Sequence, residues 1–283
     1  MKISSFYIVL ICVALACNQP GAGNKHALDL RPNDTPHAKK QQVLIQNDTE
    51  KKIIALFDSI FVLPQEDGAA AHPKEEIYID SLLKLFKNPS TFKLPFEHLS
   101  QKNVIIRTSD DQKLRAISWL SPYSGTMWYV QTIAQYDTSN DTMLVASLNR
   151  LFTPATETGT PTPFIDKVYF LPGPETPGYL LIGQGQMSGT EPYSTAHILQ
   201  VAPNQFHVND ALFPKKELPF TTATVKGNDD AAAIRKQIAI QYDPVAMKLQ
   251  VPQTRETSTG SVFSGRQQIY QFKKGAFVTM GRL

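Results

Sequence analysis

The chain lacks a hydrophobic run long enough to cross a membrane as a helix, and it lacks a strong excess of charge. Its most apolar run, from Ile3 to Ala16, has about 14 residues, whereas a bilayer needs about 20. The formal net charge of +3 is too small to indicate nucleic acid as a partner. Cysteine is also scarce, since the 283 residues include only Cys12 and Cys17.

The apolar run follows a basic residue, Lys2, and has the length of the central region of a secretory signal peptide. The stretch that ends it, Val13-Ala14-Leu15-Ala16-Cys17, resembles the lipobox of bacterial lipoproteins. The resemblance implies that residues 1–16 are a signal peptide, cleaved just before Cys17, and that the Cys17 thiol carries the lipid. The alternative is an ordinary secretory signal cleaved at the same place, with Cys17 unmodified.

A lipid on Cys17 would leave the mature chain without a free thiol. That excludes a disulfide, a cysteine nucleophile and a zinc site of the cysteine type. Two or three acyl chains would hold the protein at the membrane, because a single chain binds only marginally. The residue after the cysteine is Asn18. Aspartate there would indicate the inner membrane under the enterobacterial sorting rule, so the resemblance implies the periplasmic face of the outer membrane.

Two segments precede the β-rich part of the chain. Residues 17–45 contain glycine, proline and asparagine without sustained periodicity, and they predict a flexible tether. Residues 46–90 predict a pair of helices, the first starting at N-cap side chains in Asn47–Thr49 and the second running near Lys74 to Lys87. Both carry apolar residues at helical spacing, which predicts one core-facing stripe on each helix.

Residues 91–283 change to a period of two and to β-rich runs separated by turn residues. About ten strands are expected, with no confident helix between them, which excludes a parallel α/β sheet because such a sheet needs crossovers. We therefore predict a mainly β (α+β) fold. It consists of the N-terminal helical pair followed by an antiparallel β meander, arranged as a sandwich or in a propeller-like way.

One pattern in this region recurs within the chain, and two others resemble known sequences. The string Gln-Tyr-Asp ends a predicted strand at residues 135–137 and again at residues 241–243, which favours repeated β-units. The segments Leu94–Leu99 and Thr108–Asp111 resemble secreted proteins and lipoproteins of Bacteroidota that have no assigned activity. The hairpin turn that begins at Ser109 is similar to those of TolB-like propellers, with Asp110 in place of proline and Gln112 in place of glycine. The resemblances imply no catalytic residues.

Four aromatic residues are the predicted ligand-binding candidates: Trp119, Tyr123, Trp128 and Tyr129. The first two flank a Ser-Pro turn, and the last two point to opposite faces of a predicted strand. One of each pair is therefore expected to lean outward or into a groove. Exposed aromatic side chains stack on sugar rings or anchor protein interfaces. Core packing is the alternative for each of them.

Other motifs predict structural roles. Gly183–Gly189 superficially resembles a dinucleotide-binding loop, but the glycine spacing differs and no helix follows, so a flexible loop is predicted. His197 and His207 could be neighbours across a hairpin, without carboxylates in support. Asp229-Asp230 is predicted to cap a short helix over residues 231–236, because calcium needs six to eight oxygen ligands. No metal, cofactor or catalytic residue is predicted.

We therefore expect a lipid-anchored protein of the cell envelope without enzymatic activity. It would bind an envelope protein or a glycan through the loops of its β domain. The alternative is a hydrolase of envelope glycans, whose paired carboxylates the sequence does not identify.

Overall fold

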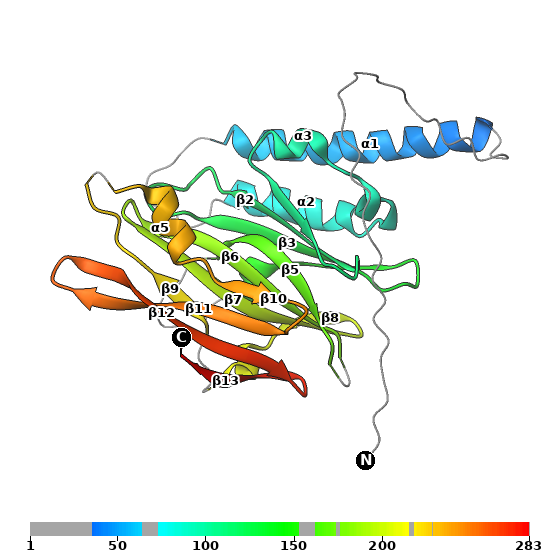
Figure 1. Cartoon of the computed structure of the whole chain (residues 1–283). Coiled ribbons are helices and arrows are strands. Elements are labelled where there is room, and N and C mark those ends of the chain that lie inside the picture. The colour runs from blue at the N-terminus through cyan, green and yellow to red at the C-terminus, as the bar shows by residue number, and fades with distance from the viewer. Residues whose placement is uncertain are drawn as a thin grey trace, which may run out of the picture.

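The computed structural model describes residues 36–63, 73–152, 162–173, 176–214, 218–227 and 229–282, with side chains from residue 48 to 281 of these ranges. In them the chain forms a stack of layers, with helices first and three antiparallel sheets after them (Figure 1). The predicted mainly β fold with an N-terminal helical pair is confirmed. Residues 1–16 and Cys17, to which we assign the signal peptide and the lipid, lie outside the described residues.

The first layer consists of the two predicted helices. They are α1 (Pro36–Phe61) and α2 (Pro73–Phe86), followed by the short η1 (Pro89–Lys93) and α3 (Glu97–Ser100). The predicted apolar stripes are confirmed, since Ile53, Phe57 and Ile60 of α1 are fully buried, as are the α2 residues at equivalent spacing. Among the described residues, no helix combines the length and the apolar character that a membrane span requires.

The helix α1 begins earlier than its sequence suggested. It starts at Pro36, inside residues 17–45 that we assigned to the tether, and the segment Asn47–Thr49 lies within the helix rather than at its N-terminus. Composition accounts for the difference. After Pro36, which a first helical turn tolerates, neither proline nor glycine follows until the end of the helix. Alanine, lysine and glutamine there favour helix.

Each sheet is a meander in which neighbours in the sequence are neighbours in the sheet. The first sheet comprises β1 (Ile105–Thr108), β2 (Leu114–Leu120), β3 (Val130–Asp137) and β4 (Met143–Ser147), and α4 (Leu148–Phe152) follows it. The second comprises β5 (Phe164–Leu171), β6 (Gly178–Ser188), β7 (Glu191–Ala202) and β8 (Gln205–Val208); after η2 (Asp210–Leu212), β9 (Phe220–Thr222) pairs with β7. The third comprises β10 (Gln241–Asp243), β11 (Lys248–Thr257), β12 (Gly260–Lys273) and β13 (Ala276–Arg282), preceded by α5 (Ala231–Gln237).

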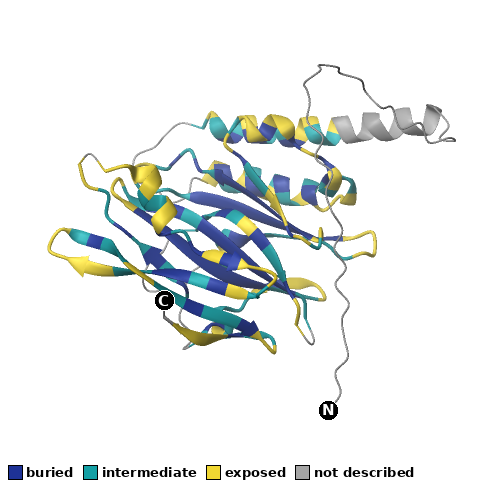
Figure 2. Cartoon of the chain, viewed as in Figure 1, coloured by how far each residue is buried: buried dark blue, intermediate teal, exposed yellow. Residues whose placement is uncertain are grey.

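The layers pack through three successive cores. In β2, Ile117 and Trp119 belong to the core against the helices, whereas Ala116 belongs to the core against the second sheet. In β6, Leu181 faces the first sheet and Leu180 the third. This alternation is the period of two in a strand, and it buries both faces of the central sheet, as the dark central strands of Figure 2 show. The stacked sheets form a sandwich-like arrangement.

The two Gln-Tyr-Asp strings occupy different places in their sheets. The first ends the third strand of the first sheet, β3, and the second forms the first strand of the third sheet, β10. The three meanders are similar units, but this match does not mark equivalent positions in them.

The predicted flexible loop at Gly183–Gly189 is wrong, because β6 continues to Ser188 and pairs with β7. Glycine is a weak strand former, so the sequence pattern ended the strand too early. Close packing explains the glycines instead. A side chain at Gly183 would meet the backbone oxygen of Phe164, and one at Gly185 would meet the ring of Tyr193.

The acidic turn between β1 and β2 fastens two layers together. Within the turn, the carboxylate of Asp111 accepts hydrogen bonds from the Ser109 hydroxyl and from a backbone N–H, as expected for turn residues. Across the interface, Asp110 Oδ1 accepts from the Phe170 backbone N–H at 2.9 Å, and Asp111 Oδ2 accepts from the Tyr179 hydroxyl at 2.8 Å. The turn therefore joins the first sheet to the second.

Candidate ligand-binding site

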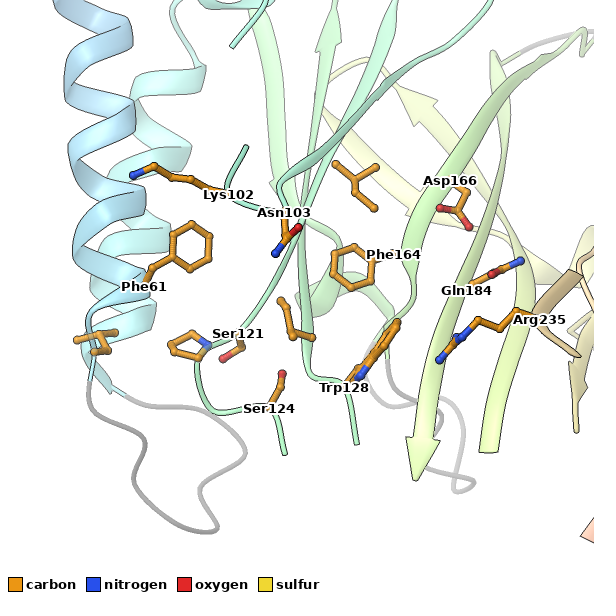
Figure 3. A pocket seen from close by; sticks show the side chains of 14 residues that line it. Phe61, Lys102, Asn103, Ser121, Ser124, Trp128, Phe164, Asp166, Gln184 and Arg235 are labelled. Atoms are coloured by element: carbon orange, nitrogen blue, oxygen red, sulfur yellow. The ribbon is translucent and has the colours of Figure 1, made fainter. Parts of the chain in front are cut away.

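A cavity of about 710 Å³ opens where the C-terminal end of α1 meets the first and second sheets (Figure 3). Its volume lies in the usual range of small-molecule sites, roughly 300–1,000 Å³. The lining residues come from segments far apart in the sequence, from Phe61 in α1 to Arg235 in α5. The fold, rather than any local motif, therefore creates this site.

One wall of the cavity is apolar. It continues the core between the helices and the first sheet, since Phe61 stacks against the buried Phe57 with ring centroids 6.1 Å apart. The aliphatic residues and proline of the lining are Leu63, Ile105, Leu120 and Pro122.

The facing wall is polar and contains Asp166 from β5, Gln184 from β6 and Arg235 from α5. Figure 3 shows these three side chains across the cavity from Phe61. Asp166 lies at a β-bulge, where the pairing of β5 with β6 shifts between Ile165 and Lys167. Asp166 stands two positions after Phe164, and both side chains line the cavity, as the period of two in a strand predicts.

The carboxyl group of Asp166 is available to a ligand. Burial raises the pKa of Asp166 above its ordinary value, and the positive charges of Arg107, Lys167 and Arg235 oppose this shift. Arg107 donates to the backbone oxygen of Asp166 at 2.9 Å, not to its side chain. Within the described part of the chain, no hydrogen bond satisfies the carboxyl group itself. A hydrogen bond donated by a ligand would therefore stabilise this carboxyl group.

Two aromatic rings lie between the walls. The Trp128 and Phe164 rings meet edge to face, with centroids 5.8 Å apart. The guanidinium carbon of Arg235 lies 4.6 Å from the centroid of the Trp128 ring, a cation–π geometry. The Trp128 backbone N–H donates to the Gln186 carbonyl at 3.0 Å. The indole is thus held from two directions.

Arg235 is positioned by the short helix α5. Asp230 caps this helix, because its carboxylate accepts from the backbone N–H groups of Ala232 and Ala233; the predicted capping role is confirmed. Arg235 then donates to the Gly185 carbonyl at 3.1 Å and to the side-chain oxygen of Gln186. Burial lowers the pKa of Arg235, and the charge of Asp166 opposes the shift.

Two further polar residues of the lining, Lys102 and Ser121, contact the helices. Lys102 forms an exposed ion pair with Asp58 of α1. Ser121 donates from its hydroxyl to Glu75 Oε2 at 2.8 Å. Glu75 lies in the first turn of α2 and is buried, which raises its pKa, although the hydrogen bond from Ser121 opposes this. Asn103 and Ser124 complete the lining.

The structure separates the four predicted aromatic residues. Trp128 lines the cavity. Trp119 is fully buried, and its ring meets the Phe57 ring edge to face with centroids 5.1 Å apart. It is therefore a core residue. Tyr123 is 9% exposed, and Tyr129 is half-buried and donates from its backbone N–H to Ser124 Oγ at 2.9 Å. Neither tyrosine belongs to the cavity lining, all of whose residues are described.

Sequence reasoning missed Phe164, Asp166, Gln184 and Arg235. One local signal was present, since aspartate is uncommon in a strand and Asp166, together with Lys167, interrupts an otherwise apolar run. The other three carry no local signal, because their role depends on segments that are distant in the sequence.

His197 contributes to packing, whereas His207 is exposed. His197 Nδ1 lies 3.0 Å from Asp210 Oδ2, and the ring stacks on Phe152 at 4.3 Å. His207 lies opposite Gln200 in the sheet, so it is not paired with His197. Within the described ranges, no group of three or more His, Cys, Asp or Glu residues is arranged to hold a metal ion.

No protein-family model matches the sequence, and neither the curated proteins nor the solved structures contain a significant match. The interpretation of the cavity rests on its own geometry.

Proposed function

We propose that this protein is a non-enzymatic binding protein of the cell envelope, anchored to the membrane through Cys17, and that its cavity binds a glycan. The observation that carries the proposal is the combination of the Trp128–Phe164 aromatic pair with Asp166, Gln184 and Arg235 in one cavity. Binding sites of small ligands typically combine an apolar lining with a few oriented polar groups.

The polar groups suit a polyhydroxylated ring. A carboxylate accepts hydrogen bonds, a guanidinium donates them, and an amide does both. A sugar hydroxyl can both donate and accept, so one ring can engage Asp166, Gln184 and Arg235 together. The apolar face of the ring would lie on the indole of Trp128. The concave shape favours a glycan over a protein partner, because protein interfaces of standard size need about 800 Å² on each side.

Binding is favoured over hydrolysis by the carboxyl groups of the lining. Most glycoside hydrolases act through two carboxyl groups, roughly 5–9.5 Å apart, on either side of the scissile bond. Among the described lining residues, Asp166 is the single carboxylic acid. This supports a glycan-binding role over the alternative of an envelope glycan hydrolase.

The membrane anchor is supported by the sequence. The short apolar run and the lipobox-like stretch that ends at Cys17 are typical of a lipoprotein leader. Two or three acyl chains on one residue suffice for stable anchoring. Asn18 after the cysteine favours the periplasmic face of the outer membrane. The proposed partners are thus the membrane, through the lipid, and a glycan, through the cavity.

Replacing Trp128 with alanine is expected to weaken glycan binding about 10- to 100-fold, because the sugar loses the apolar surface on which it stacks. A panel of soluble oligosaccharides identifies a ligand, and isothermal titration calorimetry then gives the dissociation constants.

The matched control for this prediction is Tyr129→Ala, because Tyr129 is adjacent in the chain but does not line the cavity. Its affinity should stay within about twofold of the wild type. Equal losses in the two variants, or no loss with Trp128→Ala, would contradict the assignment of the cavity.

The anchor predicts that the full chain partitions into the detergent phase on phase separation and that mass spectrometry finds an acylated N-terminal Cys17. Cys17→Ser should move the protein to the aqueous phase. Cys12→Ser, inside the predicted leader, is the matched control and should leave the partition unchanged. An unmodified Cys17 at the mature N-terminus would disprove the anchor.

A further inference from the structure

The cavity assigned to a glycan is divided by element into two chemically different halves. Asp166, Gln184 and Arg235 come from β5, β6 and α5, whereas Phe61 ends α1 and Leu63 follows it. Figure 3 shows Phe61 on the helical side together with Lys102, Asn103, Ser121 and Ser124, and Asp166, Gln184 and Arg235 opposite.

A sugar fits only the polar half. Near Phe61 and Leu63 the hydroxyl groups of a second sugar would lose their water and find few free partners, which costs free energy. Three of the four polar side chains on this side are already engaged, since Lys102 pairs with Asp58, Ser121 donates to Glu75 and Ser124 bonds the Tyr129 backbone, which leaves Asn103. An apolar group in this half gains free energy instead, about 0.8 kcal/mol for each buried methylene.

We infer that the natural ligand is a glycoside with an apolar aglycone, whose sugar contacts Trp128 and Asp166 and whose alkyl or acyl chain lies against the end of α1. The inference rests on the proposed function and adds the chemical class of the second half of the ligand. Glycolipids and acylated saccharides both have this chemistry.

The position of Asp166 supports this orientation of the ligand. Its carboxyl group lines the cavity at the bulge in β5 and lacks a hydrogen-bond donor among the described residues. It therefore binds a group that donates hydrogen bonds, such as a sugar hydroxyl, and disfavours an aliphatic chain. The sugar is thereby directed to the β5 side, and the chain to the α1 side.

The test uses NMR titration of the purified full chain with pairs of glycosides that share one sugar. The probes are the methyl and hexyl glycosides of glucose, galactose, mannose and N-acetylglucosamine, together with 1-hexanol. For the sugar that binds, the hexyl glycoside should bind at least about tenfold more tightly than the methyl glycoside, which corresponds to about two buried methylenes. Hexanol alone should bind at least about tenfold more weakly than the hexyl glycoside.

Variants at two neighbouring positions test where the alkyl chain of the ligand lies. Leu63 lines the cavity, whereas Val62 is 79% exposed and lies outside the lining. Leu63→Asp should reduce the ratio of the hexyl to the methyl glycoside affinity to about one, because the new charge disfavours the alkyl chain. Val62→Asp introduces the same charge one residue away and should change neither affinity.

The outcomes distinguish the inference from the function on which it rests. Equal affinities for methyl and hexyl glycosides would overturn the inference and leave glycan binding intact. If Leu63→Asp still bound the hexyl glycoside as much more tightly than the methyl glycoside as the wild type does, the alkyl chain would not lie against the end of α1. Failure of every glycoside to bind would overturn the proposed function itself, as would equally tight binding of hexanol, because the sugar would then contribute nothing.

Discussion

Trp119→Ala is expected to lower the free energy of unfolding by about 3–5 kcal/mol, the usual loss for a large aromatic residue removed from a core. Trp119 is fully buried in β2 on the side that faces the helices. Its ring meets Phe57 of α1 edge to face, with centroids 5.1 Å apart and planes at 88°. The substitution therefore removes a main contact between the helical layer and the first sheet, and it leaves a cavity there.

The measurement is urea unfolding followed by far-UV circular dichroism, because loss of a tryptophan would change a fluorescence signal for other reasons. Trp128→Ala is the matched control, since the two tryptophans are the only ones in the chain. Trp128 is only half-buried, so its removal should cost less than half as much stability. Equal losses in the two variants would contradict the division between a core tryptophan and a binding tryptophan.

Arg115→Met is expected to lower the free energy of unfolding by a similar amount, about 3–5 kcal/mol. Arg115 is 3% exposed, and its guanidinium donates to the carbonyl oxygens of Thr91 and Leu94 at 2.6 and 3.0 Å and to Gln135 Oε1 at 2.7 Å. Methionine has a similar length and fills the space, but it leaves these acceptors buried without a donor. Each unsatisfied acceptor costs about 1–3 kcal/mol.

The charge of Arg115 persists in this environment. Burial lowers the pKa of Arg115 to about 10, so the group is protonated at neutral pH. The rings of Phe92 and Phe96 lie 5.1 and 5.2 Å from its guanidinium carbon and stabilise the cation. The residue therefore attaches the segment η1 to the first sheet through both hydrogen bonds and ring contacts.

Two further variants separate the loss of a positive charge from the loss of the guanidinium hydrogen bonds. Arg255→Met replaces an exposed arginine of β11 and should change the stability by no more than about 0.5 kcal/mol. Arg115→Lys retains the charge but lacks the planar fork that reaches several acceptors, so it should recover less than half of the loss. A loss from Arg115→Met that is no larger than the loss from Arg255→Met would contradict the structural role of Arg115.

Local patterns were sufficient to predict many of the helices and strands of this fold. The spacing of Ile79, Leu82 and Phe86 predicts a helix with one buried face, and α2 has that face buried. The turn residues Ser109–Asp111 predict a hairpin, and β1 and β2 form it. Such predictions succeed because capping, periodicity and turn chemistry depend on residues within a few positions of one another.

The candidate site was only partly accessible to the same reasoning. Trp128 was among the predicted residues because it stands out by type. Trp119 has the same residue type and a similar sequence context, yet it is fully buried, since the face of β2 on which it lies is covered by α1. Whether an aromatic residue in a strand contacts the core or a ligand depends on which layer covers that strand face.

The helical pair and the antiparallel meander could be predicted from the sequence, because periodicity and turn chemistry reside in short continuous stretches. The leader pattern that ends at Cys17 is equally local and stays a prediction. Tertiary packing alone set how the three meanders stack as layers and brought Asp166 into a cavity shared with Phe61 and Arg235. The physical reason is that stacking joins surfaces separated by more than a hundred residues. The packed layers together, rather than any single segment, determine which faces become buried and where a gap persists between them.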